Sequence, residues 1–333
     1  MEENIMTSSI QLNNDSNLAY LLDGNGGTRE LDANEIATWT PQAGNIWVHL
    51  NYSSSADAEW LTHSSGLDPL IVEALLAEET RPRTTAMGDG LLIALRGVNH
   101  NPGADPEDMV SIRLYIDDTR IVTSRKRELI SVTDLIEQFN LKRGPRDTTK
   151  FLVELVDRLV LRMSDTVDLF EDKVAELEEL LLATESRSLR KELAALRRQA
   201  ITIRRYLAPE REALSRLMIE KVSWLDDDSR LQLREVSDRL IRHIEDIDAV
   251  RERAAVTQEE LQSRLAEQMN TRMYVLSVVA AIFLPLGFLT GLLGINVGGI
   301  PGAEYPKAFL IFIGMLVAVV AFQMLLFRWK KWI

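Results

Sequence analysis

The chain has 333 residues and no cysteine, and its 38 Lys and Arg side chains stand against 50 Asp and Glu, a formal net charge of −12. Without cysteine it can form no disulfide framework, Cys-ligated zinc finger, iron–sulfur cluster or cysteine nucleophile. The acidic balance argues against a nucleic-acid partner, because a phosphate backbone needs a basic surface, and it suits the attraction of cations.

Residues 1–147 alternate strand-like and helix-like stretches, which predicts a mixed domain of the α+β class. Runs rich in Val, Ile and Leu predict five strands, at Leu18–Asp23, Asn45–Asn51, Leu91–Val98, Met109–Asp117 and Arg120–Arg127. Helices are predicted at Asp57–His63, Pro69–Glu79 and Ser131–Phe139. This region contains no phosphate-binding, metalloprotease or serine-hydrolase motif, so we expect no enzymatic activity.

From Thr148 the chain is nearly free of glycine and rich in Leu, Glu, Arg and Ala, which favour helix. Residues 148–228 predict a helical hairpin: Thr148–Ala183, whose apolar residues recur every three or four positions, and Leu189–Met218, interrupted near Pro209. Ser229 or Asp228 is expected to cap a third helix.

The third helix is predicted to be very long. Neither proline nor glycine occurs between Ser229 and Pro285, so residues 229–293 predict one helix on the order of 100 Å in length. Its first part, residues 229–272, forms a stalk with an apolar seam for partner helices.

Two segments, Met273–Leu293 and Ala308–Phe327, contain no charged residue. About 20 helical residues cross the ~30 Å hydrocarbon layer of a bilayer, so both are predicted to be transmembrane helices. Basic residues precede the first segment and recur in the tail, residues 328–333. We therefore expect both chain ends to be cytoplasmic, which makes residues 1–147 a cytoplasmic domain, and the loop of residues 294–307 to be external.

A stripe of mostly small or weakly polar residues runs along the first membrane segment at alternating steps of three and four, and consists of Asn270, Met273, Ser277, Ala280, Leu284, Gly287 and Gly291. This period keeps one stripe facing a common axis. Two interpretations stay open, since small residues allow close helix packing and weakly polar ones can line a pore.

The stalk and the acidic loop before it are together mildly acidic, with 12 Asp and Glu against 8 Lys and Arg between Asp226 and Arg272. A solvated helix face with ion pairs accounts for most of this surplus. The alternative is a regulatory metal site between subunits, for which the candidates are Glu235, Glu245, Asp246 and Glu259.

Directly after the first membrane segment stands Gly294-Ile295-Asn296, followed by a short external loop and the second segment. In this position the motif resembles the CorA superfamily of divalent-cation channels, whose loop begins Gly-Met-Asn. The isoleucine and the Gly-Gly-Ile-Pro continuation are most similar to the zinc-transporting ZntB branch. Residues 79–83, Glu-Thr-Arg-Pro-Arg, also look like a family signature.

The resemblance implies a homopentameric funnel in the bacterial inner membrane, with five stalk helices around a central pore. Gly294, Ile295 and Asn296 match the signature of the pore entrance, and Asn270 and Met273 match positions at its inner neck. Five Asn296 carboxamides present a ring of dipoles that can bind the waters of a hydrated ion, and Glu304 is expected to concentrate cations outside.

The four histidines all lie in the predicted cytoplasmic part, and cysteine is absent. Because zinc prefers these two ligand types at close range, weak passage of a hydrated ion is expected rather than a tight pore site.

The sequence thus predicts a transporter of divalent cations, zinc first, without a cofactor other than its cargo. The same fold with magnesium, cobalt or nickel as cargo is the alternative, and the choice between channel and proton-coupled carrier stays open. A membrane-anchored signalling protein is a rival that the short external loop argues against.

Overall fold

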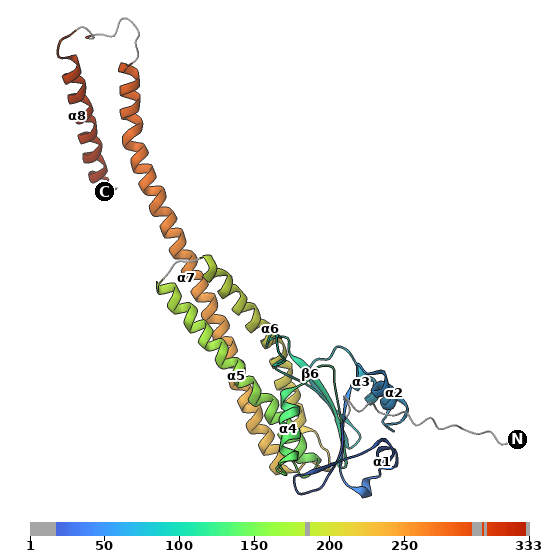
Figure 1. Ribbon diagram of the computed structural model, residues 1–333. Helices are drawn as coiled ribbons and strands as arrows, with labels where there is room; N and C mark the ends of the chain where they lie inside the picture. The colour runs from blue at the N-terminus through green and yellow to red at the C-terminus, as the bar shows by residue number, and fades with distance from the viewer. Residues whose placement is uncertain (1–17, 184–186, 295–301, 303–304, 331–333) are drawn as a thin grey trace, which may run out of the picture. The chain divides into compact units, whose positions relative to one another are not determined.

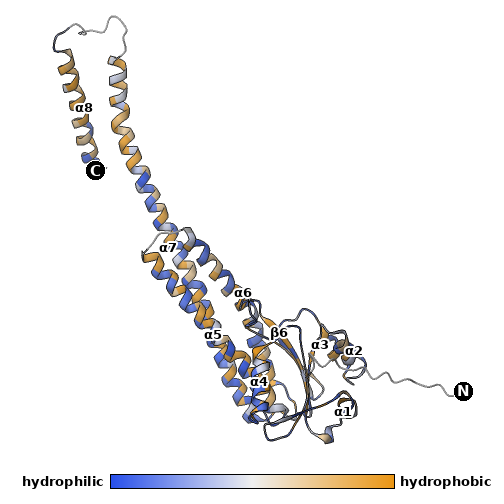
Figure 2. Ribbon diagram, viewed as in Figure 1, coloured by the Kyte–Doolittle hydropathy of each residue, from blue (hydrophilic) through white to orange (hydrophobic). Residues whose placement is uncertain are grey.

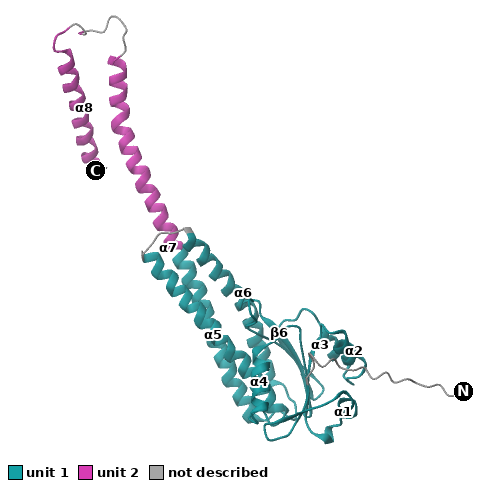
Figure 3. Ribbon diagram, viewed as in Figure 1, with its two compact units in different colours: residues 1–258 teal, residues 259–333 magenta. Residues whose placement is uncertain are grey.

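A computed structural model describes residues 18–183, 187–294, 302 and 305–330 (Figure 1). The chain divides into two compact units, residues 1–258 and residues 259–333 (Figure 3). The boundary falls within helix α7 (Asp227–Gly294), so this helix contributes to both units.

Unit 1 is built on a seven-stranded mixed sheet with the order β2-β1-β3-β7-β6-β5-β4. Within the described residues, β3 and β7 form its parallel pair, and the other neighbours are antiparallel. The strands are β1 (Leu18–Leu22), β2 (Thr28–Glu30), β3 (Ile46–Asn51), β4 (Arg83–Met87), β5 (Gly90–Gly97), β6 (Val110–Ile116) and β7 (Arg120–Arg125).

Helices cover both faces of this sheet, so its central strands are buried almost throughout. Val48 faces a core shared with α2 (Ser55–His63) and α3 (Pro69–Leu76). Its neighbour Trp47 faces the other side, because successive strand residues alternate. There the Trp47 ring lies 5.9 Å from Phe139 of α4 (Ile130–Asn140) and 4.9 Å from Phe151 of α5 (Thr148–Ala183).

The predicted strands and helices of residues 18–140 are confirmed, and three short elements were not predicted: β2, β4 and α1 (Ala33–Thr38). A 3₁₀ turn, η1 (Pro41–Ala43), follows α1. Helix α1 is fixed by a capping box in which the Asp32 carboxylate accepts from the Glu35 amide and the Glu35 carboxylate accepts from the Asp32 amide.

Two long helices follow, α5 (Thr148–Ala183) and α6 (Arg187–Ile219). Helix α5 has the predicted bounds. The predicted interruption of α6 near Pro209 is wrong, because α6 continues through this proline. An interior proline costs roughly 3 kcal/mol. The following turns pack on β4 and β5, where Thr84 Oγ1 donates to the Ala213 carbonyl at 2.9 Å and Leu217 is fully buried. This packing offsets the local cost.

Helix α7 begins at Asp227, two residues before the predicted start. Its cap is Asp226, whose Oδ1 accepts from the Ser229 amide at 2.6 Å, so the predicted caps Ser229 and Asp228 are wrong. Four core residues of α7 recur at seven-residue intervals and are at most 1% exposed: Leu233, Leu240, Ile247 and Ala254. Ion pairs join α7 to α5 at Arg239–Asp157 and Arg253–Glu178.

Unit 2 consists of the remainder of α7 and helix α8 (Ala308–Trp329). Both helices are long and apolar enough to cross a membrane, and Figure 2 shows the C-terminal half of α7 in unit 2 and most of α8 in hydrophobic colours. The half-buried or buried side chains of α8 recur every three or four residues and mark its contact with α7: Ala308, Phe312, Leu316, Val319, Val320, Gln323 and Phe327.

Candidate ion pathway

The structure places the whole predicted stripe on α7, on a side that α8 leaves largely uncovered. Its members are exposed in the single chain, apart from Ala280, which is half-buried. The α7 residues that lose exposure to α8 lie mainly on another side: Val278, Ala281, Ile282, Leu286 and Leu289. At 100° per residue the two sets point in largely different directions. One side of α7 therefore packs on α8. Most of the stripe is left for contacts outside the chain, although Gly287 also borders a cavity that α8 lines.

The two glycines of the stripe, Gly287 and Gly291, are not required by packing within one chain, and neither is Gly294 of the entrance motif. A Cβ atom added to any of the three meets nothing within 4 Å. Ser277 Oγ donates to the Met273 carbonyl at 2.8 Å, which leaves the lone pairs of its hydroxyl oxygen free to accept from water. Under either open interpretation this face contacts something outside the chain: another helix if it is a packing surface, or water and ions if it lines a pore.

The predicted entrance is described only in part. Gly294 is the last residue of α7, whereas Ile295, Asn296 and Glu304 lie outside the described residues. Near Gly294, a cavity of about 610 Å³ lies between the end of α7 and the start of α8. Its lining is apolar apart from Thr290 and Tyr305, so it suits a lipid or protein side chain better than a cation.

The four acidic candidates on α7 do not meet in a single chain. Glu235, Glu245 and Glu259 are exposed and Asp246 is half-buried. Glu235 and Asp246 are 11 positions apart, about 17 Å along a helix. Among the described residues, no group of three or more His, Cys, Asp or Glu side chains is arranged to hold a metal ion. A regulatory metal site between subunits stays a prediction.

His49 is fully buried in a hydrogen-bond network that sequence reasoning missed. Arg125 Nε donates to His49 Nε2 at 2.7 Å, and His49 Nδ1 lies 2.7 Å from Thr123 Oγ1. Burial, with Arg125 as a second cause, lowers the pKa of His49 to about 3. Both ring nitrogens are engaged, so His49 is a neutral structural residue rather than a zinc ligand.

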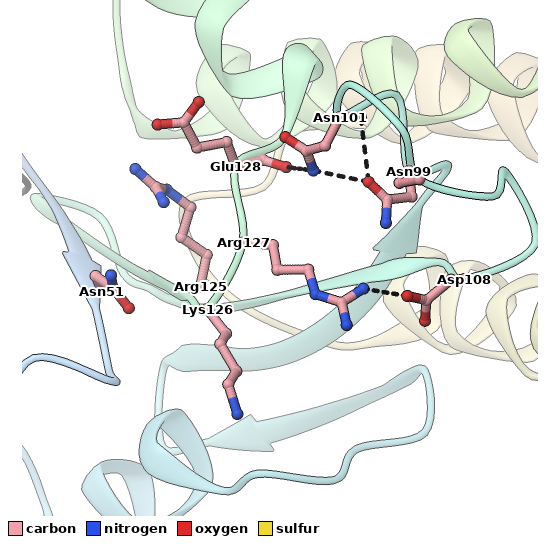
Figure 4. Close-up of a pocket in the computed structure, with 9 residues that line it drawn as sticks. Asn51, Asn99, Asn101, Asp108, Arg125, Lys126, Arg127 and Glu128 are labelled. Carbon is pink, nitrogen blue, oxygen red and sulfur yellow. Dashed lines mark hydrogen bonds and ion pairs between the residues drawn. The ribbon is translucent and has the colours of Figure 1, made fainter.

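Unit 1 has a cavity of about 540 Å³ at the carboxyl ends of the parallel strands β3 and β7 (Figure 4). Three basic side chains and two acidic ones line it, and Arg127 forms an ion pair with Asp108. Asn101 Nδ2 donates to the Glu128 carbonyl at 3.1 Å. The positive balance of these charges disfavours a divalent cation here.

A match to a family model accounts for this arrangement of sheet, long helix and apolar helix pair. The model of the CorA-like Mg2+ transporter protein matches residues 42–330, which run from before β3 to the end of α8. The chain belongs to this family. The predicted resemblance and the predicted fold class, an α+β domain with a long helix and two apolar C-terminal helices, are thereby confirmed.

Individual relatives match over nearly their full length. The chain is 38% identical over 319 residues to the zinc transport protein ZntB of Yersinia enterocolitica, covering 96% of each. It is 39% identical over 318 residues to the divalent cation transporter CmaX of Pseudomonas aeruginosa, covering 94% of this chain and 96% of CmaX.

Solved structures agree with these matches. The full-length CmaX structure superposes with a TM-score of 0.83 at 38% identity, covering 95% of this chain and 97% of that one. The CorA magnesium transporter of Methanocaldococcus jannaschii has a TM-score of 0.81 at 20% identity, covering 95% and 99%, which shows the same fold.

Proposed function

We propose that the chain transports divalent cations, zinc first, across the bacterial inner membrane through the central pore of a homopentamer. The observation that carries this proposal is the position of the stripe: its small and weakly polar residues lie on the side of α7 that α8 leaves largely uncovered. In a chain of the CorA-like family, five such faces around one axis form a continuous lining. Close packing of α7 helices is then the consequence of the same arrangement.

The relatives support zinc as the first cargo. Proteins named zinc transport protein and divalent cation transporter are 38% and 39% identical to this chain over almost its whole length. His49 does not contradict weak binding, because it is fully engaged in its own network. Passage of a hydrated ion past dipoles needs no tight ligand set.

In this proposal Gly294, Ile295 and Asn296 form the external entrance, and Glu304 raises the local cation concentration. Ser277 and the glycines line the middle of the path, and Asn270 and Met273 form its inner neck. Both chain ends are cytoplasmic, because basic residues flank the two apolar helices on that side. No acidic residue or histidine occurs within either apolar segment, so any proton coupling takes place at the mouth or in the stalk.

The test is ion flux into liposomes that hold the purified chain, with zinc and magnesium measured separately, with and without a proton gradient. Asn296→Ala is compared with Asn140→Ala, a matched control at the exposed end of α4. We expect zinc flux in the wild type and the control, and loss of it in Asn296→Ala. Native mass spectrometry of the same samples is expected to show five copies.

The other outcomes are equally informative. Magnesium flux without zinc flux supports magnesium as the cargo instead of zinc. A flux that responds to the proton gradient identifies a proton-coupled carrier. Absence of flux for either ion overturns the proposal and favours the signalling rival.

A further inference from the structure

One buried polar side chain lies between α7 and α8. Gln323 of α8 is 9% exposed, and within the described part of unit 2 it is the polar side chain that is buried. Its Nε2 donates to the main-chain carbonyl of Ala281 in α7 at 3.1 Å. The two residues are 42 positions apart, so this contact joins the two apolar helices directly.

The Ala281 carbonyl, which accepts from Gln323, lacks its usual hydrogen-bond donor within α7. In an α-helix the carbonyl of residue 281 accepts from the amide of residue 285. That residue is Pro285, which has no N–H and lies inside α7. In hydrocarbon, an unpaired carbonyl costs several kcal/mol unless a neighbouring helix satisfies it. Gln323 supplies from α8 the donor that Pro285 withholds.

The side chain at this position has few alternatives. An amide on a two-methylene stem donates an N–H without adding a charge between the two apolar helices, whereas an ionised Glu has no donor to offer. Ala281 is small, which leaves α8 room to approach its carbonyl. Gln323 Oε1 is buried without a hydrogen-bond partner in the described structure. The donor half of the amide is therefore the half that this site uses.

We propose that Gln323 is a positioning residue for the ion pathway: it replaces the helix bond lost at Pro285 and sets the direction of α7 beyond this proline. The segment after Pro285 carries Gly287 and Gly291, the outer end of the stripe, and Gly294 of the entrance motif. A carbonyl without its partner allows α7 to bend at this point. The contact keeps the inner and outer parts of the stripe in line. The pathway part of this inference rests on the proposed function, whereas the bond itself does not.

A double-mutant cycle in the full-length protein tests the pairing. Gln323→Met keeps length and flexibility but removes the donor, and Pro285→Ala returns an N–H to the Ala281 carbonyl. Thermal unfolding in detergent and zinc flux in liposomes are measured for both single variants and the double variant. Met324→Leu is the matched control, because Met324 is exposed on the same helix.

In the wild-type background we expect Gln323→Met to lower the unfolding midpoint by roughly 2–4 °C and to reduce zinc flux several-fold. In the Pro285→Ala background the same change is expected to have little effect on either readout, because the carbonyl then has its own helix partner. Pro285→Ser, which also restores the N–H, serves as a second background if Pro285→Ala assembles poorly.

Equal effects of Gln323→Met in both backgrounds overturn the inference. The two proposals fail separately. A wild type without flux refutes the transport function while the unfolding cycle still reports the bond. Additive unfolding midpoints in a chain that transports zinc refute the role of Gln323 and leave the transport function intact.

Discussion

The main-chain amide of Arg96 in β5 donates to Oε1 of Glu210 in α6 at 3.2 Å. Strand β4 begins opposite Ala94 and does not extend to Arg96, so Glu210 takes the place of a partner strand. Glu210 is 1% exposed, and its Oε2 has no hydrogen-bond partner within the described structure. Burial raises the pKa of Glu210 to about 8, partly offset by Arg96. Glu210 therefore holds a proton at neutral pH.

This proton makes stability depend on pH. Between the ordinary pKa of 4.5 and the folded value of about 8, the folded chain binds one more proton than the unfolded chain, so stability falls as pH rises through this range. We expect Glu210→Gln to remove this loss, which is on the order of a few kcal/mol. The prediction is checked by unfolding midpoints of the full-length protein between pH 5 and about pH 8.5. It is contradicted if the midpoints of the variant and the wild type fall with pH in parallel.

His49 gives the opposite dependence. Its pKa is lowered from 6.5 to about 3, so below pH 6.5 the unfolded chain binds the extra proton and stability is lost as pH falls toward 3. His49→Gln is expected to reduce the loss of folding stability at acid pH. It is also expected to lower stability at pH 7, because Arg125 and Thr123 lose their hydrogen bonds to the His49 ring. Tryptophan fluorescence follows the transition, since the Trp47 ring lies 5.7 Å from His49. An unchanged acid midpoint contradicts the assignment.

The core seam of α7 predicts a large effect of truncation. Leu240 is fully buried, so Leu240→Ala is expected to destabilise unit 1 by about 2–5 kcal/mol through lost burial and a cavity. Leu231 of the same helix is 57% exposed, and Leu231→Ala is expected to change stability by no more than about 0.5 kcal/mol. Urea unfolding, followed by circular dichroism, compares the two variants. Similar unfolding midpoints contradict the role of Leu240 in the core.

If the stripe lines the ion pathway, large side chains on it are expected to block ion flux even where they meet nothing within a single chain. Gly291 of α7 and Gly314 of α8 each have open space where a Cβ would lie, so a side chain can start at either position without a clash within one chain. We expect Gly291→Leu to reduce zinc flux roughly tenfold or more by narrowing the pathway, and Gly314→Leu to retain it. Equal flux in the two variants, at equal incorporation into liposomes, argues that Gly291 does not line the pathway.

The long helices were predictable because their signals are local. Helix α5 spans Thr148–Ala183 as its apolar period indicates, and α7 runs on because no proline or glycine stops it before Pro285. Strand β2 was missed because it has three residues, which are too few to show a period. Strand β4 has five residues, as β1 has, but its sequence Arg-Thr-Thr-Ala-Met lacks the Val, Ile and Leu that indicated the other strands. Helix α1 did carry a readable signal, since Asp32 and Glu35 have the spacing of a capping box.

In the candidate site, too, the features with a local sequence signal were predictable and the long-range contacts were not. The stripe follows from helical spacing alone, and the Gly294-Ile295-Asn296 motif follows from its place after an apolar segment. Long-range pairs do not follow from the sequence. Nothing near Gln323 indicates that its partner is Ala281, and nothing near Glu210 indicates Arg96, because tertiary packing brings each pair together.

The parallel pairing of β3 with β7 also has a consequence for synthesis. Ile46 of β3 pairs with Arg120 of β7, so the strand emerges from the ribosome more than 70 residues before its inner neighbour. During that interval one edge of β3 lacks its sheet neighbour, whereas β5 and β6 can pair locally as soon as both have been synthesised. The β3 edge is thus open to mispairing until β7 has been synthesised.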